Sequence, residues 1–136
     1  MKNVLKRIWR GGLFYLNLIR ERIDDRIADA SIEALVDSDV EKHFKDKRPT
    51  IMYVGIRYDY GKKHWGLSYE HYQFYETLLN MSYSLIYFDY DVIKQKYGAK
   101  KASLMLREAV YLYHPDFLFY IHYADWIRHE VWKEIS

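Results

Sequence analysis

Two side chains able to handle a hydroxyl group, Asp59 and His71, flank a turn-rich segment near the middle of this 136-residue chain. Histidine has an ordinary pKa near 6.5, and the positive end of a helix would favour its neutral, base-competent form. Asp59 can grip a sugar diol with both carboxylate oxygens. Each also has a structural explanation, His71 as a surface histidine that touches Tyr75 and Asp59 as a cap of the turn at Gly61. The sequence leaves both alternatives open.

A strand and a helix must position these residues. The apolar run Ile51–Val54 stops at Gly55, which predicts a central strand of a parallel sheet. Ser68 is a good N-cap for the next helix, and Glu70 lies in its first turn. Open α/β sheets bind ligands where the carboxyl end of a strand meets the N-terminus of the following helix. We therefore expect a binding crevice lined by the loop from Arg57 to His71.

His71 is the expected catalytic residue, as the base, and the expected ligand-binding residues come mostly from this loop. Ser68 and Glu70 are also explained as capping residues, and His122 as part of the crevice rim. The basic loop residues suit a phosphorylated ligand, although solvated loop charge explains them equally. The full ligand-binding set is Tyr58, Asp59, Tyr60, Gly61, Ser68, Glu70 and His122.

Cofactor and metal sites are not expected. Asp89 follows the second apolar run, where a dinucleotide-binding fold places its ribose-binding acid, but the glycines of the preceding loop lack the G-x-G-x-x-G spacing. The Asp89–Asp91 tripeptide also matches the D-x-D of metal-dependent transferases, yet Asp91 is explained as an N-cap. His122, Asp125 and His129 have spacings compatible with a metal, but they are better explained as a helix cap and the crevice rim.

The alternating pattern from residue 50 onwards predicts the fold class. Apolar runs at 51–54, 85–88 and 117–121 alternate with helical segments, giving β-α-β-α-β-α. We expect an incomplete Rossmann-like, three-layer α/β domain over residues 50–136, with a parallel sheet in the order 3-2-1. Its C-terminal residues resemble a helix end before a further strand, so we expect a truncated domain. Residues 1–49 are expected to form a separate segment, a long helix at 13–35 followed by a charged connector.

Composition narrows the function classes. Half of the residues are hydrophobic, which argues against disorder, and the absence of cysteine excludes disulfides and thiolate metal sites. The net charge of +2 gives no bulk attraction for nucleic acid. Residues 1–19 are basic and apolar, and they either contact a membrane surface weakly or dock as an ordinary helix. We expect a cytoplasmic protein, peripheral to the membrane in the first case.

Four segments carry a family resemblance, over about residues 51–136. They are IMYVG, IRYDYGKKHWGLSYEHYQFYETL, LIYFDYD and HPDFLFYIHYADWI. Together they resemble the N-terminal domain of GT-B-type glycosyltransferases related to the CgeB-like spore-maturation proteins. The block from Tyr-Asp-Tyr-Gly to Glu-His-Tyr is the most specific part of the likeness.

The resemblance implies a function. In that family two Rossmann-like domains face each other, the C-terminal one holding the nucleotide-sugar and the N-terminal one the acceptor. It therefore implies the acceptor-side part of a glycosyltransferase that moves a sugar to a hydroxyl of a sugar or glycan. That part would be inactive alone and would reach the nucleotide-sugar only through a missing C-terminal domain. The alternative is a stand-alone α/β module that binds a ligand or a protein without catalysis.

Overall fold

The computed structural model describes residues 31–46, 49–122 and 127–136. The chain divides into two compact units, residues 1–32 and 33–136, and the second is described here. Almost all of the expected N-terminal helix, and all of the segment 1–19, lie outside the described residues. Residues 31–39 are helical.

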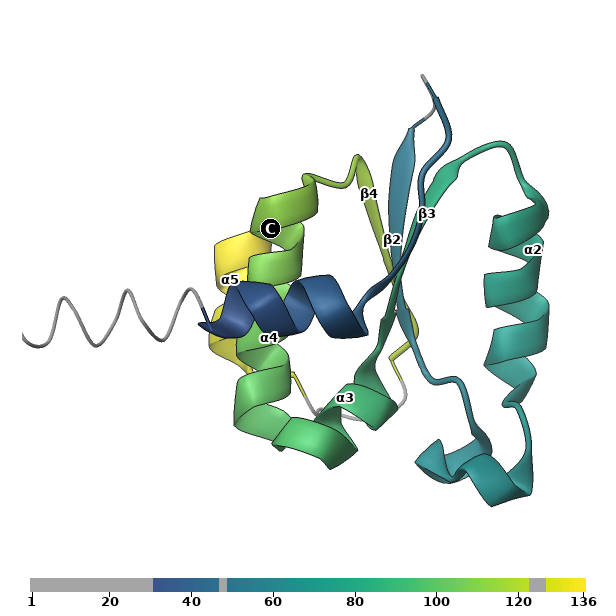
Figure 1. Ribbon diagram of the computed structural model, residues 1–136, viewed down its shortest axis with the longest axis horizontal. Coiled ribbons are helices and arrows are strands. Elements are labelled where there is room, and N and C mark those ends of the chain that lie inside the picture. The colour runs from purple at the N-terminus through teal and green to yellow at the C-terminus, as the bar shows by residue number, and fades with distance from the viewer. Residues whose placement is uncertain (1–30, 47–48, 123–126) are drawn as a thin grey trace, which may run out of the picture. The chain divides into compact units, whose positions relative to one another are not determined.

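A mixed four-stranded sheet forms the centre of this unit, in the order β1-β3-β2-β4 (Figure 1). Strand β2 is parallel to both β3 and β4, whereas β1 is antiparallel to β3. The continuous apolar run of β2 therefore lies between two parallel strands, as its sequence predicts. The strands are β1 (Glu41–His43), β2 (Thr50–Gly55), β3 (Ser84–Asp89) and β4 (Phe117–Tyr120).

The expected strand order 3-2-1 is wrong, and so is the purely parallel sheet. That order places the second predicted strand, β3, beside the third, whereas β2 lies between β3 and β4. Right-handed crossovers are equally feasible in either direction along a sheet, and the alternating pattern does not specify the direction of the second one. Strand β1, which falls within the predicted charged connector, adds the antiparallel pairing.

Helices cover both faces of the sheet, which makes three layers (Figure 1). One face carries the helix that begins after Ser68, passes through a π-helical turn at His71–Tyr75 and continues as α2 (Glu76–Asn80). The opposite face carries α3 (Tyr90–Tyr97), α4 (Ala99–Tyr113) and α5 (His129–Ile135). Opposite faces are what right-handed crossovers in opposite directions require. Among the described residues, no helix has the length and apolar character needed to span a membrane.

The two faces of the sheet bury different side chains. Towards α2, Tyr53, Leu85 and Tyr87 pack with Tyr75 in an aromatic core, and the Tyr53 and Tyr87 rings stack at 5.2 Å between centroids. Alternate strand residues point the other way, because successive side chains of a strand face opposite sides. On that face the buried hydrophobic residues of the strands and of α4 are Met52, Val54, Ile86, Phe88, Ala102, Met105, Leu106 and Ala109.

Candidate functional site

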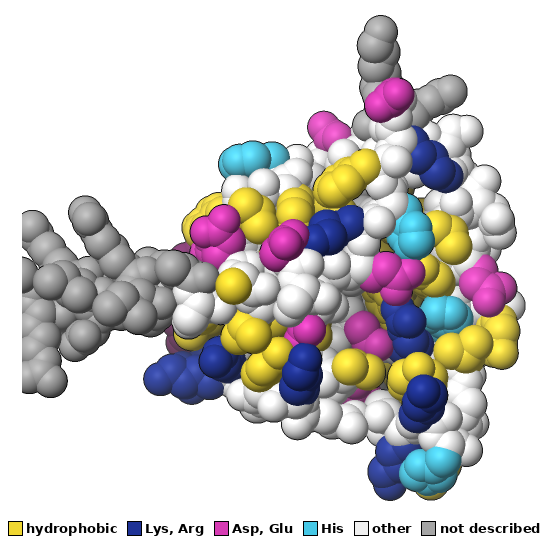
Figure 2. Space-filling view, viewed as in Figure 1, with side chains coloured by type: hydrophobic (Ala, Val, Ile, Leu, Met, Phe, Trp, Pro, Cys, Tyr) yellow, Lys and Arg dark blue, Asp and Glu magenta, His cyan; other side chains and the backbone are white. Residues whose placement is uncertain are grey.

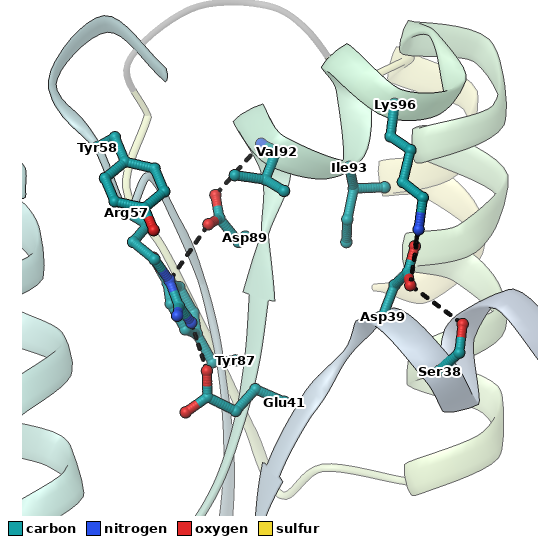
Figure 3. A pocket seen from close by; sticks show the side chains of 10 residues that line it. All are labelled: Ser38, Asp39, Glu41, Arg57, Tyr58, Tyr87, Asp89, Val92, Ile93 and Lys96. Atoms are coloured by element: carbon teal, nitrogen blue, oxygen red, sulfur yellow. Dashed lines mark hydrogen bonds and ion pairs between the residues drawn. The ribbon is translucent and has the colours of Figure 1, made fainter. Parts of the chain in front are cut away.

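A polar crevice of about 330 Å³ opens at the carboxyl ends of β2 and β3 (Figure 3). This volume is at the lower end of the range for ligand pockets, about 300–1,000 Å³. The lining side chains come from the segment before β1, the first residue of β1, the loop after β2, the end of β3 and the face of α3. They are Ser38, Asp39, Glu41, Arg57, Tyr58, Tyr87, Asp89, Val92, Ile93 and Lys96.

The short strand β1 explains where the crevice lies. Its first residue, Glu41, pairs with Tyr87, so the β1 side of β3 has no strand partner beyond that point towards Asp89, whereas β2 pairs with β3 to its end. The loops that leave β2 and β3 lead to helices on opposite faces of the sheet (Figure 1). The crevice lies on the β1 side of β3 and not between β2 and β4, where the strand order reverses and open α/β sheets usually bind ligands.

Arg57 lies at the centre of the charged groups. Its Nη2 donates to Glu41 Oε2, and its Nε lies 3.4 Å from Asp89 Oδ2 (Figure 3). The guanidinium carbon lies 5.0 Å from the ring centroid of Tyr87, a distance typical of a cation–π contact. Arg57 thus contacts the carboxylates of Glu41 and Asp89 and, through Tyr87, the aromatic core.

Glu41 is held in its ionised form. Its carboxylate accepts hydrogen bonds from the hydroxyl of Tyr75 and from Arg57, and its Oε1 lies 2.7 Å from Nε2 of His43. Burial by itself would raise the pKa of Glu41, but these hydrogen bonds outweigh it and lower that pKa to about 2. Glu41 is therefore an anion throughout the neutral range and a very weak base.

Asp89 has the opposite character. Burial raises the pKa of its carboxyl to about 6, more than the Val92 N–H and the Arg57 charge lower it. Its contacts are long, because Val92 N donates to Oδ1 at 3.4 Å and Arg57 Nε lies at 3.4 Å from Oδ2. This carboxylate keeps capacity to accept hydrogen bonds, and its pKa lies in the range that suits a general base.

Two buried donors in the same place make no hydrogen bond, although one of them, Nε of Arg57, lies 3.4 Å from Asp89 Oδ2. Among the described residues, neither the hydroxyl of Tyr87 nor Nε of Arg57 makes a hydrogen bond. A buried polar group without a partner costs about 1–3 kcal/mol, so native structures usually supply one. A bound molecule with hydroxyl groups would provide these donors with acceptors and Asp89 with donors.

On the opposite wall, Lys96 forms an ion pair with Asp39. Its Nζ lies 2.8 Å and 3.1 Å from the two carboxylate oxygens, one of which also accepts from the hydroxyl of Ser38 (Figure 3). Both cations that line the crevice, Arg57 and Lys96, are therefore paired with acids. This arrangement favours an uncharged polar ligand over a strongly charged one.

The predicted loop residues are not all brought to the crevice. Tyr58 lines it. Asp59, Tyr60 and Gly61 form the 3-10 turn η1 (Asp59–Gly61), in which Asp59 and Tyr60 are exposed and Gly61 is buried against α3. None of these three lines the crevice.

The predicted residues at the helix start have structural contacts. Ser68 is fully buried, and its Oγ accepts from His71 N at 3.0 Å and donates to Ile56 O at 2.7 Å, so its capping role is confirmed. The carbonyl of Glu70 accepts from the hydroxyl of Tyr53 at 3.4 Å. Neither residue lines the crevice. Asp91 was expected to cap the next helix, but α3 begins at Tyr90 and its cap is Asp89.

His71 is on the core side of the helix that contains it. It is 6 % exposed, its ring stacks on Tyr75 at 4.6 Å, and burial followed by the nearby Arg57 charge lowers its pKa. It is not among the residues that line the crevice, and its role as a base stays a prediction. His122 follows β4 and lines a separate hollow with Tyr120 and Trp132.

Several crevice residues were missed from the sequence. Asp89 has a visible signal, because it is an acid directly after an apolar strand. The glycine motif that would identify it as a ligand-binding acid is missing, so the sequence does not predict its place in the site. Glu41 has no such signal, because its strand contains no apolar residue. Arg57, Tyr87 and Lys96 each look like an ordinary loop, strand or helix residue when read locally.

Comparisons with known proteins add no relative to this description. Neither the protein-family models, nor the curated proteins, nor the solved structures compared with the chain give a match.

Proposed function

We propose that residues 33–136 are the acceptor-side domain of a glycosyltransferase and bind a polyhydroxylated acceptor in the crevice at the carboxyl ends of β2 and β3. One observation carries the proposal. The buried donors Tyr87 Oη and Arg57 Nε make no internal hydrogen bond, and both residues line the same crevice as Asp89, whose carboxylate is the ion-pair partner of Arg57. A sugar diol offers both acceptors and donors, so it complements this set.

The charge balance supports a sugar. Arg57 and Lys96 are already paired with acids, so a strongly anionic ligand would compete with three carboxylates in the same crevice. An uncharged sugar introduces no such repulsion. Tyr58 adds an aromatic ring to the wall, and aromatic rings combine a large contact area with a polar tip.

Within this proposal Asp89 accepts the proton of the acceptor hydroxyl. With a pKa of about 6 it is ionised at neutral pH and still basic enough to take the proton. The acceptor oxygen then bonds to the anomeric carbon of the donor sugar, and the bond from that carbon to the nucleoside diphosphate breaks. The donor is supplied by a second domain, as the family resemblance implies.

A stand-alone binding module is the second candidate. The observation that favours it is that every crevice residue lies within residues 33–136, so binding needs no further domain. Both candidates predict saccharide binding, and they differ in whether transfer occurs once a donor-binding domain is present.

The proposal is tested by titrating the chain with mono- and disaccharides and following backbone amide NMR shifts. The Tyr87→Phe variant removes one hydroxyl that makes no internal hydrogen bond. We expect saccharide affinity to fall about fivefold or more and the thermal midpoint to stay the same or rise, because the variant no longer buries an unpaired hydroxyl. The matched control is Tyr53→Phe, which removes the hydroxyl of a buried tyrosine that does not line the crevice. Saccharide shifts that avoid the crevice, or equal affinity in both variants, would refute the proposal.

A further inference from the structure

We infer that the acceptor is an acidic glycan chain, whose uncharged terminal sugar enters the crevice and whose following acidic units lie on the exposed loop after β2. This inference rests on the proposed function and names the substrate class of the same site. Its evidence is a group of side chains that we call the loop cluster: Tyr60, Lys62, His64 and Trp65.

The loop cluster is an exposed aromatic surface. Tyr60 is 62 % and Trp65 53 % exposed, and their rings meet edge to face at 5.1 Å between centroids. Lys62 Nζ lies 4.9 Å from the Trp65 ring centroid, and the His64 ring lies 5.9 Å from it. Basic, histidine and hydrophobic side chains gather over this part of the molecule in Figure 2. Rings of this size exposed together indicate a contact surface.

The loop that carries the cluster is held in one conformation. Its two ends pair, since Asp59 N donates to Gly66 O at 3.1 Å and Ser68 N donates to Arg57 O at 2.8 Å. The Gln95 side chain of α3 donates to the carbonyl of Gly61 at 2.6 Å. A surface ordered in this way before binding loses little conformational entropy when the ligand arrives.

Tyr60 has an unusual backbone for a tyrosine. Its φ of 49° and ψ of 28° lie in the left-handed region, which is unfavourable for residues other than glycine. Such conformations cost about 1–3 kcal/mol and cluster at ligand-binding positions. The strain at Tyr60 places its ring beside Trp65.

The position and charge of the cluster identify its partner. Tyr58 lines the crevice and bridges Leu67, and the cluster occupies the loop between these two residues, so it adjoins the crevice wall. Flat aromatic rings suit sugar rings, and Lys62 and the adjacent exposed Lys63 suit carboxylate or phosphate groups on them. A membrane or a single-stranded nucleic acid would also use aromatic and basic groups, but neither accounts for the continuity with the crevice.

The test is calorimetric titration of the full chain with the monomer N-acetylglucosamine, with the acidic tetramer and hexamer of hyaluronan, in which this neutral sugar alternates with glucuronic acid, and with uncharged maltohexaose. We expect the acidic hexamer to bind at least tenfold more tightly than the monomer. Trp65→Ala should remove most of that gain and change monomer affinity less than twofold. Lys62→Gln with Lys63→Gln should weaken the acidic hexamer alone, and added salt should reduce the difference.

Control variants at distant exposed positions are Tyr83→Ala and Lys100→Gln. If the hexamer binds no better than the monomer, or Trp65→Ala binds it like the unmodified chain, the inference is wrong while the proposed function stands. If no saccharide of any length binds, both are wrong. Anionic phosphatidylglycerol vesicles and oligo-dT serve as further probes, and binding of either through Trp65 with no hexamer binding would also overturn the inference.

Discussion

Arg57 Nε and Asp89 Oδ2 lie 3.4 Å apart, and this ion pair joins the loop that leaves β2 to the last residue of β3. The other carboxylate oxygen of this buried side chain accepts a hydrogen bond from Val92 N at 3.4 Å, which is also long. The crevice thus contains a carboxylate whose protonation state changes near neutral pH.

The pH dependence of stability should reveal Asp89. Its pKa rises from an ordinary 3.8 to about 6 on folding, so the folded state binds its proton more tightly than the unfolded state does. The protonated carboxyl therefore contributes on the order of 2–3 kcal/mol to the free energy of unfolding. This contribution is fully present below about pH 4 and is lost as the pH rises through 6. Asp89→Asn keeps a capping side chain and lacks this titration.

Urea unfolding of Asp89→Asn and the unmodified chain at pH 4, 5, 6 and 7 checks this. We expect the variant to gain relative stability as the pH rises and to equal or exceed the unmodified chain at pH 7. The exposed Asp46→Asn is the control. A constant difference between variant and unmodified chain across these pH values would contradict the raised pKa.

Glu41 should behave in the opposite sense. Its pKa falls from 4.5 to about 2 on folding, so its contribution is present above pH 4.5 and is lost as the pH falls towards 2. Glu41→Gln should cost about 1–2 kcal/mol at pH 7, after allowance for the partial exposure of the side chain. The cost should shrink in acid, whereas the exposed Glu33→Gln should change little at any pH.

Ser68→Ala should destabilise the domain by about 1–3 kcal/mol. The change removes the cap of the helix and leaves the buried His71 N–H and Ile56 carbonyl each without this partner. Thermal unfolding measures the loss, with the exposed Ser82→Ala as the matched control. Equal midpoints for the two variants would show that the cap is unimportant.

Gln95→Ala should loosen the loop after β2 without unfolding the domain. It removes the hydrogen bond to the Gly61 carbonyl, and we expect faster amide hydrogen exchange at Gly61, Lys62 and Trp65. Gln73→Ala, which alters an exposed glutamine on another helix, is the control. Unchanged exchange in the loop would mean that other contacts hold it.

The sequence predicts those parts of the fold whose signals are local. Strands β2, β3 and β4 are short apolar runs, and Ser68 has the side-chain chemistry of a cap. Strand β1 has no such signal, because Glu-Lys-His forms a strand only by pairing with β3. The direction of the crossover from β3 to β4 also has no local signal. It is set only when the sheet assembles, so the sequence did not predict the strand order.

In the candidate site, too, only the residues with a local sequence signal could be predicted. The carboxyl edge of β2 was expected to hold the crevice, and Tyr58 lines it. Glu41 could not be foreseen, since the unpredicted strand β1 brings it to Arg57. The orientation of His71 could not be predicted from its position at the start of the helix. The sequence does not reveal the π-helical turn that begins at this residue.

That π-helical turn gives the two ends of its helix a fixed rotational offset from each other. A π-turn amounts to one residue inserted into an α-helix, and each α-helical residue turns the chain by about 100°. The insertion lets Ser68 and the loop keep one orientation while Leu78 and Leu79 keep another against the sheet. Deleting a single residue between His71 and Tyr75 would force a choice between them, so in evolution this short stretch should tolerate substitution far better than a change in length.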